Sequence, residues 1–411
     1  DPFLDQGQLT LTCCTAAAED ARDIDDLGFM TELRGSLPGE PSEGQLLQWH
    51  NAPLGSPLQA VEYVGPLRVQ RFPDRGRGLI VTEDCLPGRL LILSKAFLVV
   101  PRDRLESAVR KALSSASCSK QDSQRFQALS GGFKDAAADH LKFWTEPPDV
   151  ELGCTTPDSS KQRWQTASEN DAPSQEVVEK ILLCNAFKSK QTDERQGTLQ
   201  SQMSGVWFVP SLLNHDCTPN TLGVFLGDLL IIRASRVIRA GEEATFAYCV
   251  TTQSRAERQE ALLGYGFACS CVRCRLESFV AEAHLAMQAE LAESLRARSA
   301  ATSMSDMVAK AHSTASLAEV DICKSAPLDL RREAEAQGFD VGAMLLAANF
   351  DILMAYVGRL NIKDPAATAA AECLVECMAA VLPGSPAHIF CCHCALAAHG
   401  ARAVRPTIVD A

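Results

Sequence analysis

Three of the 17 cysteines of this chain fall within six residues, in the segment YGFACSCVRC that runs from Tyr265 to Cys274. Cys269, Cys271 and Cys274 can supply three thiolates from one tight loop, whereas a tetrahedral zinc site requires four ligands. A disulfide scaffold is the other use of many cysteines, but it is typical of small secreted chains, and this chain has 411 residues. The spacing therefore favours a metal site in a reducing compartment.

Two earlier segments concentrate polar and aromatic side chains. VPSLLNHDCTPN, Val209 to Asn220, joins an apolar run to a turn that is dense in hydrogen-bonding groups and carries one thiol. GEEATFAYC, Gly241 to Cys249, predicts a turn followed by a short strand that ends at Tyr248. Loops of such content usually perform chemistry or hold a ligand.

These segments resemble the motifs of SET-domain protein lysine methyltransferases. NHDCTPN is similar to the family's NHSCxPN, GEEATFAY to GEELTxxY, and FACSCVRC to the post-SET CxCxxC motif. Upstream, GRGLIVTEDCLPGRLLI, Gly76 to Ile92, resembles the opening GRGLfAtrdIkpGelll of the same domain. The four motifs occur in the family's order, and the architecture is closest to the SMYD branch.

The resemblance and the apolar patterns together predict an α+β fold: a SET-domain β-fold of short strands with a helical insert, a post-SET zinc element and an all-α, TPR-like C-terminal domain. We expect helices in LESAVRKALSSA, in EVVEKILLCNAFKSK (Glu176 to Lys190) and in the alanine-rich sequence from Phe279 onward. The expected divisions are 1–60 leader, 61–100 SET N-terminal part, 101–200 helical insert and linker, 201–250 SET core, 251–278 post-SET element and 279–411 helical domain.

The insert departs from the SMYD pattern. SMYD proteins carry a two-zinc MYND finger where the SET domain is split, whereas Cys118, Cys154 and Cys184 are too few and too dispersed for one. A second cluster, Cys391 to Cys394, lies in a predicted helix, where adjacent side chains point in different directions. We interpret that cluster as helix packing.

The resemblance implies two bound groups, S-adenosylmethionine and a structural Zn²⁺. In SET proteins with a post-SET element, the cysteine of the NHxC motif completes the zinc site, which here gives Cys217, Cys269, Cys271 and Cys274. Residues matching the family's cofactor contacts are Arg77, Gly78, Asn185, Ser211, Leu213, Asn214, His215, Tyr248, Tyr265 and Phe267. Read alone, Gly76 and Gly78 would indicate a β-turn, and the alternative for Phe267 is core packing beneath the zinc loop.

Tyr248 stands at the family's tyrosine position and is the predicted catalytic residue, whose hydroxyl orients the substrate amine. The predicted substrate channel consists of Phe246, Tyr248 and Tyr265. In many SET enzymes the position of Phe246 tunes how many methyl groups are added, and a phenylalanine leaves room for higher methylation.

The expected function is transfer of a methyl group from S-adenosylmethionine to a lysine amine of a histone or non-histone protein, in the cytoplasm, the nucleus or both. A net charge of −12 argues against a general DNA- or RNA-binding surface, which needs clustered Lys and Arg. No apolar run approaches the roughly 20 residues that a membrane helix requires. The alternative is a catalytically inactive SET scaffold that binds protein partners. A scaffold would need the zinc ligands but not Tyr248.

Overall fold

The computed structural model describes residues 57–115, 118–129, 137–145, 173–189, 203–279, 326–339, 341–347, 350, 365–385, 388–389, 391–392 and 395. The predicted leader up to residue 56, most of the polar connection before residue 173 and the helices predicted within 280–325 lie outside these residues. Within the described part, no helix combines the length and the apolar character needed to cross a bilayer.

The described strands are short and form small sheets. One sheet has the order β1 (Tyr63–Val64), β4 (Leu90–Lys95), β10 (Leu229–Ala234), β9 (Thr221–Leu226). A second has the order β2 (Leu67–Phe72), β3 (Gly76–Val81), β11 (Glu243–Phe246), β8 (Asn214–His215). The third has the order β5 (Leu98–Pro101), β7 (Met203–Val206), β6 (Phe187–Ser189). Each sheet joins segments that precede the insert helices to segments that follow them, so these distant parts of the chain form one folded unit.

The hairpin between β9 and β10 shows how the sequence sets the register. Its turn is Gly227-Asp228, and Gly227 adopts a positive φ of 55°, which glycine accepts at little cost. Leu229 then pairs with Leu226, and Leu229 to Ile232 are all buried. The backbone oxygen of Asp228 accepts a hydrogen bond of 3.0 Å from the indole nitrogen of the buried Trp207.

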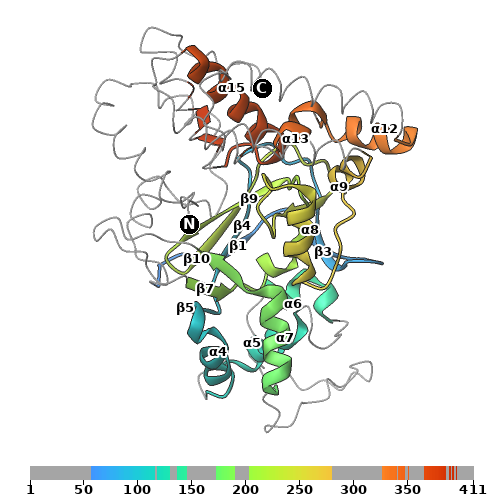
Figure 1. Cartoon of the computed structure of the whole chain (residues 1–411). Helices are drawn as coiled ribbons and strands as arrows, with labels where there is room; N and C mark the ends of the chain where they lie inside the picture. The colour runs from blue at the N-terminus through green and yellow to red at the C-terminus, as the bar shows by residue number, and fades with distance from the viewer. Residues whose placement is uncertain are drawn as a thin grey trace.

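The insert is mostly helical where it is described. Its helices are α4 (Leu105–Leu113), α5 (Lys120–Ala128), α6 (Leu141–Thr145) and α7 (Gln175–Asn185). α5 begins after Ser119, whose hydroxyl accepts from the backbone nitrogen of Asp122, and Ser174 caps α7 in the same way. Figure 1 shows these helices on one side of the strands, with the C-terminal helices on the opposite side.

The prediction of one helix from Glu176 to Lys190 is wrong in its second part. α7 ends at Asn185, Ala186 is extended, and residues 187–189 form β6. The reason is tertiary: Phe187 pairs with Gly205 of β7, and this long-range ladder outweighs local helix propensity. β7 ends at Val206, and a 3₁₀ turn (Pro210–Leu212) follows.

Beyond the strands, α8 (Arg255–Leu263) and α9 (Val272–Glu277) lead to α12 (Leu328–Ala336), α13 (Val341–Ala347) and α15 (Pro365–Val381). Ser254 and Glu257 form a reciprocal capping box at the start of α8. α12 is tied back to α9 by an ion pair of 2.7 Å between Arg275 and Glu333. The mixture of short strands and helices confirms the α+β prediction at this level.

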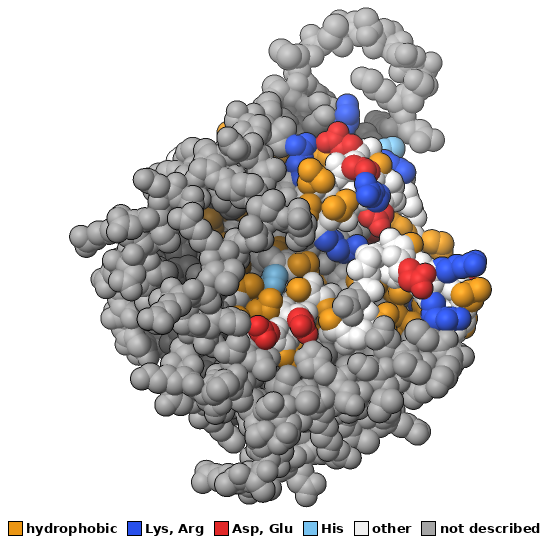
Figure 2. All heavy atoms as spheres, turned by 90° about the horizontal axis from the view of Figure 1, so that it is seen from above, with side chains coloured by type: hydrophobic (Ala, Val, Ile, Leu, Met, Phe, Trp, Pro, Cys, Tyr) orange, Lys and Arg blue, Asp and Glu red, His pale blue; other side chains and the backbone are white. Residues whose placement is uncertain are grey.

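Two surface features complete the description. On the face in Figure 2, acidic, basic and apolar side chains of the described residues are interspersed. A pocket of about 560 Å³ opens between β4 and the insert helices, lined among others by Phe97, Arg125 and Trp144. None of the predicted site residues lines that pocket, so it is separate from the site described next.

Candidate functional site

The site is built where β8 and β11 run side by side. The two strands pair in parallel, with Thr245 opposite Asn214 and Phe246 opposite His215. The backbone nitrogen of Asp216 continues the contact by donating to the backbone oxygen of Phe246 at 3.1 Å. The NHDC turn and the segment around Tyr248, far apart in sequence, are thereby held together.

Tyr248 is fixed at both its backbone and its hydroxyl. β11 ends at Phe246, two residues earlier than predicted, and the backbone nitrogen of Tyr248 donates to Nδ1 of His215 at 3.1 Å. Its hydroxyl donates to the backbone oxygen of Leu213 at 2.6 Å. Burial raises the pKa of Tyr248, so the phenol stays protonated and keeps this bond.

The partners of His215 decide its tautomer. Because Nδ1 accepts the hydrogen bond from the backbone of Tyr248, a neutral ring carries its proton on Nε2. Nε2 lies 3.2 Å from Sγ of Cys217 and is then a donor to that sulfur. Both ring nitrogens are engaged within the protein, which leaves the backbone of His215 for any contact with a cofactor.

Aromatic rings surround Tyr248. The ring centroid of Tyr265 lies 5.0 Å from that of Tyr248, and that of Phe267 lies 6.4 Å away with an edge-on orientation. Phe267 also contacts the His215 ring, with centroids 6.1 Å apart. The two aromatic residues that precede the cysteine cluster therefore form a wall beside Tyr248.

Asn214 links this wall to β3. Its side-chain nitrogen donates to the backbone oxygen of Arg77 at 3.1 Å and to Oε1 of Glu243 at 2.7 Å. A Cβ placed on Gly78 would lie 2.6 Å from that nitrogen, so the glycine makes room for the asparagine. Gly76, not Gly78, uses a positive φ, of 74°. The interpretation as a β-turn glycine therefore holds for Gly76, whereas at Gly78 a glycine is needed because Asn214 packs closely against it.

Three further predicted cofactor contacts are positioned by bonds within the protein. The Arg77 side chain reaches toward the insert, where it bonds to Asp139 at 2.9 Å and to the backbone oxygen of Ala128 at 2.7 Å. The buried Asn185 side chain donates to the backbone oxygen of Ile181, four residues earlier in α7. The hydroxyl of Ser211 donates to the backbone oxygen of Trp207 at 2.7 Å and lies 3.4 Å from that of Asn185, which places Ser211 against the end of α7.

Phe246 belongs to a cluster of aromatic side chains. Its ring centroid lies 6.0 Å from that of Phe187, in a T-shaped arrangement. Phe187 contacts Trp207 and Phe225 in turn, and a Cβ on Gly223 would lie 2.9 Å from the Phe246 ring. This cluster connects β6 to the segment before Tyr248, and the role of Phe246 in a substrate channel stays a prediction.

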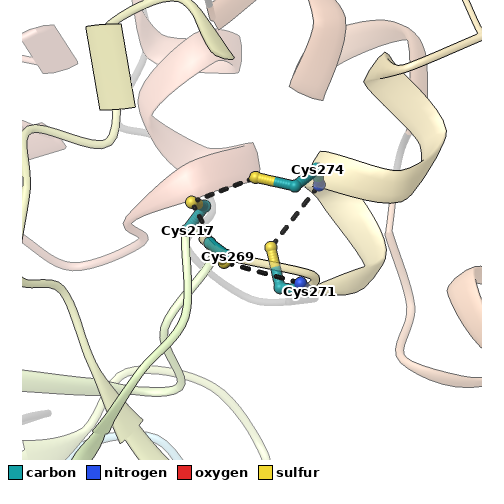
Figure 3. Close-up of side chains that lie close together, drawn as sticks. All are labelled: Cys217, Cys269, Cys271 and Cys274. Carbon is teal, nitrogen blue, oxygen red and sulfur yellow. Dashed lines mark hydrogen bonds between the residues drawn. The ribbon is translucent and has the colours of Figure 1, made fainter. Parts of the chain in front are cut away.

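The four predicted metal ligands converge (Figure 3). The sulfurs of Cys217, Cys269, Cys271 and Cys274 all lie within 4.8 Å of one another. Cys217 Sγ is 3.5 Å from that of Cys274 and 3.9 Å from that of Cys269. Four Zn–S bonds of about 2.3 Å in a tetrahedron place the sulfurs roughly 3.8 Å apart. The donor set and its spacing therefore fit a tetrahedral zinc ion.

A buried charged network supports the quartet. Arg258, Arg273 and Glu277 are almost fully buried, and Glu277 pairs with both arginines. Arg273 also donates to the backbone oxygens of Cys217 at 3.2 Å and Thr251 at 2.6 Å. A guanidinium nitrogen of Arg258 lies 3.8 Å from the sulfur of Cys274. The net positive charge of this network complements the negative charge that four thiolates around one Zn²⁺ would carry.

Sequence reasoning missed several of these residues. Glu243 stands in the GEEATFAY segment, but only the structure shows that its carboxylate faces Asn214. Cys249 ends the same segment, and its sulfur groups with His215 and Cys217. Arg258 and Glu277 lie on helices whose patterns look ordinary. The sequence offers no signal for them, because their burial is visible only in the structure.

The comparisons agree with this geometry. A family model described as the SET domain matches residues 76–249, the range from the GRG turn to Cys249. The match includes the NHDCTPN and GEEATFAY segments and supports the resemblance seen in the motifs.

Similar proteins include a protein named methyltransferase from Gibberella zeae, 26% identical over 58% of this chain and 35% of that protein. The mouse histone-lysine N-methyltransferase SMYD3 is 37% identical over 23% of this chain and 22% of its own length. The human protein-lysine N-methyltransferase SMYD4 is 41% identical over 21% of this chain and 11% of its own length. The chain thus spans about a third or less of these relatives. Among solved structures, the SET domain of LSMT bound to lysine and AdoHcy aligns over 79% of this chain and 86% of that chain, with 15% identity and a TM-score of 0.28.

Proposed function

We propose that this chain, whose residues 76–249 match the SET-domain family model, is a protein-lysine N-methyltransferase that uses S-adenosylmethionine as its methyl donor. The relatives named above as lysine methyltransferases support this activity. The substrate is a lysine side chain of a histone or non-histone protein. Because the channel accepts a lysine by shape, specificity for one protein comes from variable surfaces outside it.

One observation carries the proposal. Asn214, Leu213 and Tyr248 are joined by hydrogen bonds and strand pairing, and Tyr265 and Phe267 pack against Tyr248. These residues come from three motifs that are separate in the sequence. An inactive scaffold would need the zinc ligands but not this arrangement of aromatic residues around the Tyr248 hydroxyl.

When bound, S-adenosylmethionine supplies a sulfonium methyl group to an in-line displacement. The bond from the methyl carbon to lysine Nζ forms as the carbon–sulfur bond breaks, and sulfur keeps the electron pair. Lysine has an ordinary pKa near 10.4, so its proton must first pass to water. The aromatic residues beside Tyr248 desolvate the amine and lower its pKa. The Tyr248 hydroxyl, whose hydrogen is directed at Leu213, offers its lone pairs to the amine and orients it.

In this account Phe267 covers the adenine of the cofactor. The rest of the cofactor site is lined by Arg77, Gly78, Asn185, Ser211, Leu213, Asn214 and the backbone of His215. Zn²⁺ held by the cysteine quartet would fix the post-SET segment, including Tyr265, against Tyr248. Phe246, Tyr248 and Tyr265 would form the lysine channel, with the lack of a hydroxyl at Phe246 allowing more than one methyl group to be added.

The remaining sequence-based expectations belong to the same proposal. The helices after residue 279 form a TPR-like domain that contacts the substrate protein, and the divisions of the chain follow the boundaries expected above. The enzyme works in the cytoplasm, the nucleus or both, on protein rather than on nucleic acid.

The experiment that tests the proposal is isothermal titration of the zinc-loaded protein with S-adenosylhomocysteine. We expect binding in the micromolar range, weakened about tenfold or more by Asn214→Ala because a hydrogen bond to a charged ligand group is lost. No detectable binding by the folded, zinc-loaded protein would favour the inactive scaffold.

A further inference from the structure

Glu243 is an ionisable residue beside the proposed cofactor site that the reaction itself does not use. Its side chain is only 10% exposed, and burial raises the pKa of its carboxyl group. Oε2 pairs with Arg75 at 3.0 Å, while Oε1 accepts the hydrogen bond of 2.7 Å from Asn214. A buried carboxylate with one oxygen on a neighbouring amide constrains that amide strongly.

The two partners of the Asn214 side-chain nitrogen fix the orientation of its amide group. Both the backbone oxygen of Arg77 and the carboxylate of Glu243 are acceptors, so the group facing them must be the NH₂. A flipped amide would place Oδ1 against two other oxygens. Oδ1 must therefore point away from Glu243, and among the described residues none donates a hydrogen bond to it.

Gly78 is part of the same arrangement. A Cβ at this position would lie 2.5 Å from Oε1 of Glu243, 2.6 Å from the Asn214 nitrogen and 2.8 Å from the Phe72 ring. Such distances are below van der Waals contact, so any larger residue would separate the carboxylate from the amide. The glycine thus preserves the approach of Glu243 to Asn214.

We propose that Glu243 is a positioning residue: it locks the amide of Asn214 so that Oδ1 is presented as an acceptor to the ammonium group of the cofactor's amino-acid part. This inference rests on the proposed function, because it assigns that ligand to the site around Asn214. Glu243 acts through Asn214 and does not contact the cofactor. Its charge is already paired with Arg75.

The test is a double-mutant cycle read by titration with S-adenosylhomocysteine. Glu243→Ala removes the acceptor and should weaken binding about tenfold, the effect of one lost charge-assisted contact. Glu243→Gln still offers one oxygen to Asn214, because the half-exposed Arg75 can turn to solvent, and should stay within about threefold of the unmodified protein. In the Asn214→Ala background, Glu243→Ala should have no further effect. Glu242→Ala is the matched control, because that carboxylate caps its own turn at the backbone of Arg239.

Two results would overturn the inference. If Glu243→Gln weakens binding as much as Glu243→Ala, the charge of Glu243 acts directly on the ligand. If the Glu243→Ala and Asn214→Ala effects are additive, the two residues act independently.

A measurement without ligand separates this inference from the proposed function. In NMR spectra of protein labelled with ¹⁵N-asparagine, the resonances of the Asn214 side-chain amide protons should move upfield in Glu243→Ala. In Glu243→Gln their chemical shifts should stay close to those of the unmodified protein. Unchanged chemical shifts of these protons in Glu243→Ala would refute the proposal that Glu243 fixes the Asn214 amide. If the unmodified protein binds no S-adenosylhomocysteine while these shifts occur, the proposed function fails and the positioning role of Glu243 stands.

Discussion

The hydroxyl of Tyr248 donates a hydrogen bond of 2.6 Å to the backbone oxygen of Leu213, 35 residues earlier in the chain. This bond crosses the point where β8 and β11 meet, and the backbone bond from Tyr248 to His215 lies beside it. The hydroxyl hydrogen is thus directed into the protein, and the oxygen lone pairs remain for a substrate. The proposed chemistry depends on this orientation.

Replacing Tyr248 by phenylalanine should abolish most methyl transfer while leaving the fold and cofactor binding intact. The ring still packs against Tyr265, but the amine loses the oxygen that orients it, an effect of about a hundredfold or more on turnover. Single-turnover rates, the dissociation constant for S-adenosylhomocysteine and the melting temperature together check this. Unchanged turnover would remove Tyr248 from the mechanism.

The pH dependence of turnover should contain no tyrosine ionisation in the working range. Burial raises the pKa of Tyr248 above its ordinary value near 10, so the phenol stays neutral as pH rises. The rate should instead increase with pH as a larger fraction of the substrate lysine becomes neutral. A profile from pH 6 to 10 that falls above about pH 9, where an ordinary phenol begins to ionise, would contradict the assignment if the protein remains folded.

Replacing Cys271 by serine should lower the zinc content to well below one ion per chain and reduce the melting temperature. One missing thiolate leaves three ligands where tetrahedral zinc needs four. Cys118→Ser is the control, since that half-buried thiol lies in the insert and outside the quartet. Metal analysis of freshly purified protein checks both variants, and equal zinc content in the two would refute the site.

The buried charges behind the quartet should matter far more than an exposed ion pair on the neighbouring helix. Glu277→Gln leaves two buried guanidinium groups without their carboxylate and should cost about 3 to 5 kcal/mol of unfolding free energy. Glu333→Gln breaks the half-exposed pair with Arg275 and should cost less than about 1 kcal/mol. Urea unfolding at saturating zinc compares them. Equal losses would mean that the Glu277 network adds no more stability than a surface pair.

The features that the sequence indicates correctly are those encoded by local motifs and turn residues. The Gly227-Asp228 hairpin could be read from local residues, because its turn type depends on glycine. The cysteine spacing in one loop was equally local. The SET resemblance supplied the fourth cysteine, Cys217, which lies 52 residues before Cys269 and yet is 3.9 Å from it.

What sequence reasoning could not supply depends on contacts between distant segments. The end of α7 at Asn185 follows from the pairing of β6 with β7, which no local pattern encodes. The engagement of both His215 ring nitrogens, and the position of Glu243 against Asn214, require the parallel pairing of β8 and β11. In each case the local sequence was compatible with more than one arrangement.

The most direct test of the account is methyl transfer itself. Zinc-loaded protein is incubated with S-adenosylmethionine labelled in its methyl group and with undermethylated cytosolic and nuclear protein fractions, after which the protein is hydrolysed and N-methyl-lysine is measured. We predict label in methyl-lysine that is absent with Tyr248→Phe. Label no higher than in that variant, from a protein that binds S-adenosylhomocysteine, would contradict the assignment of this chain as a lysine methyltransferase.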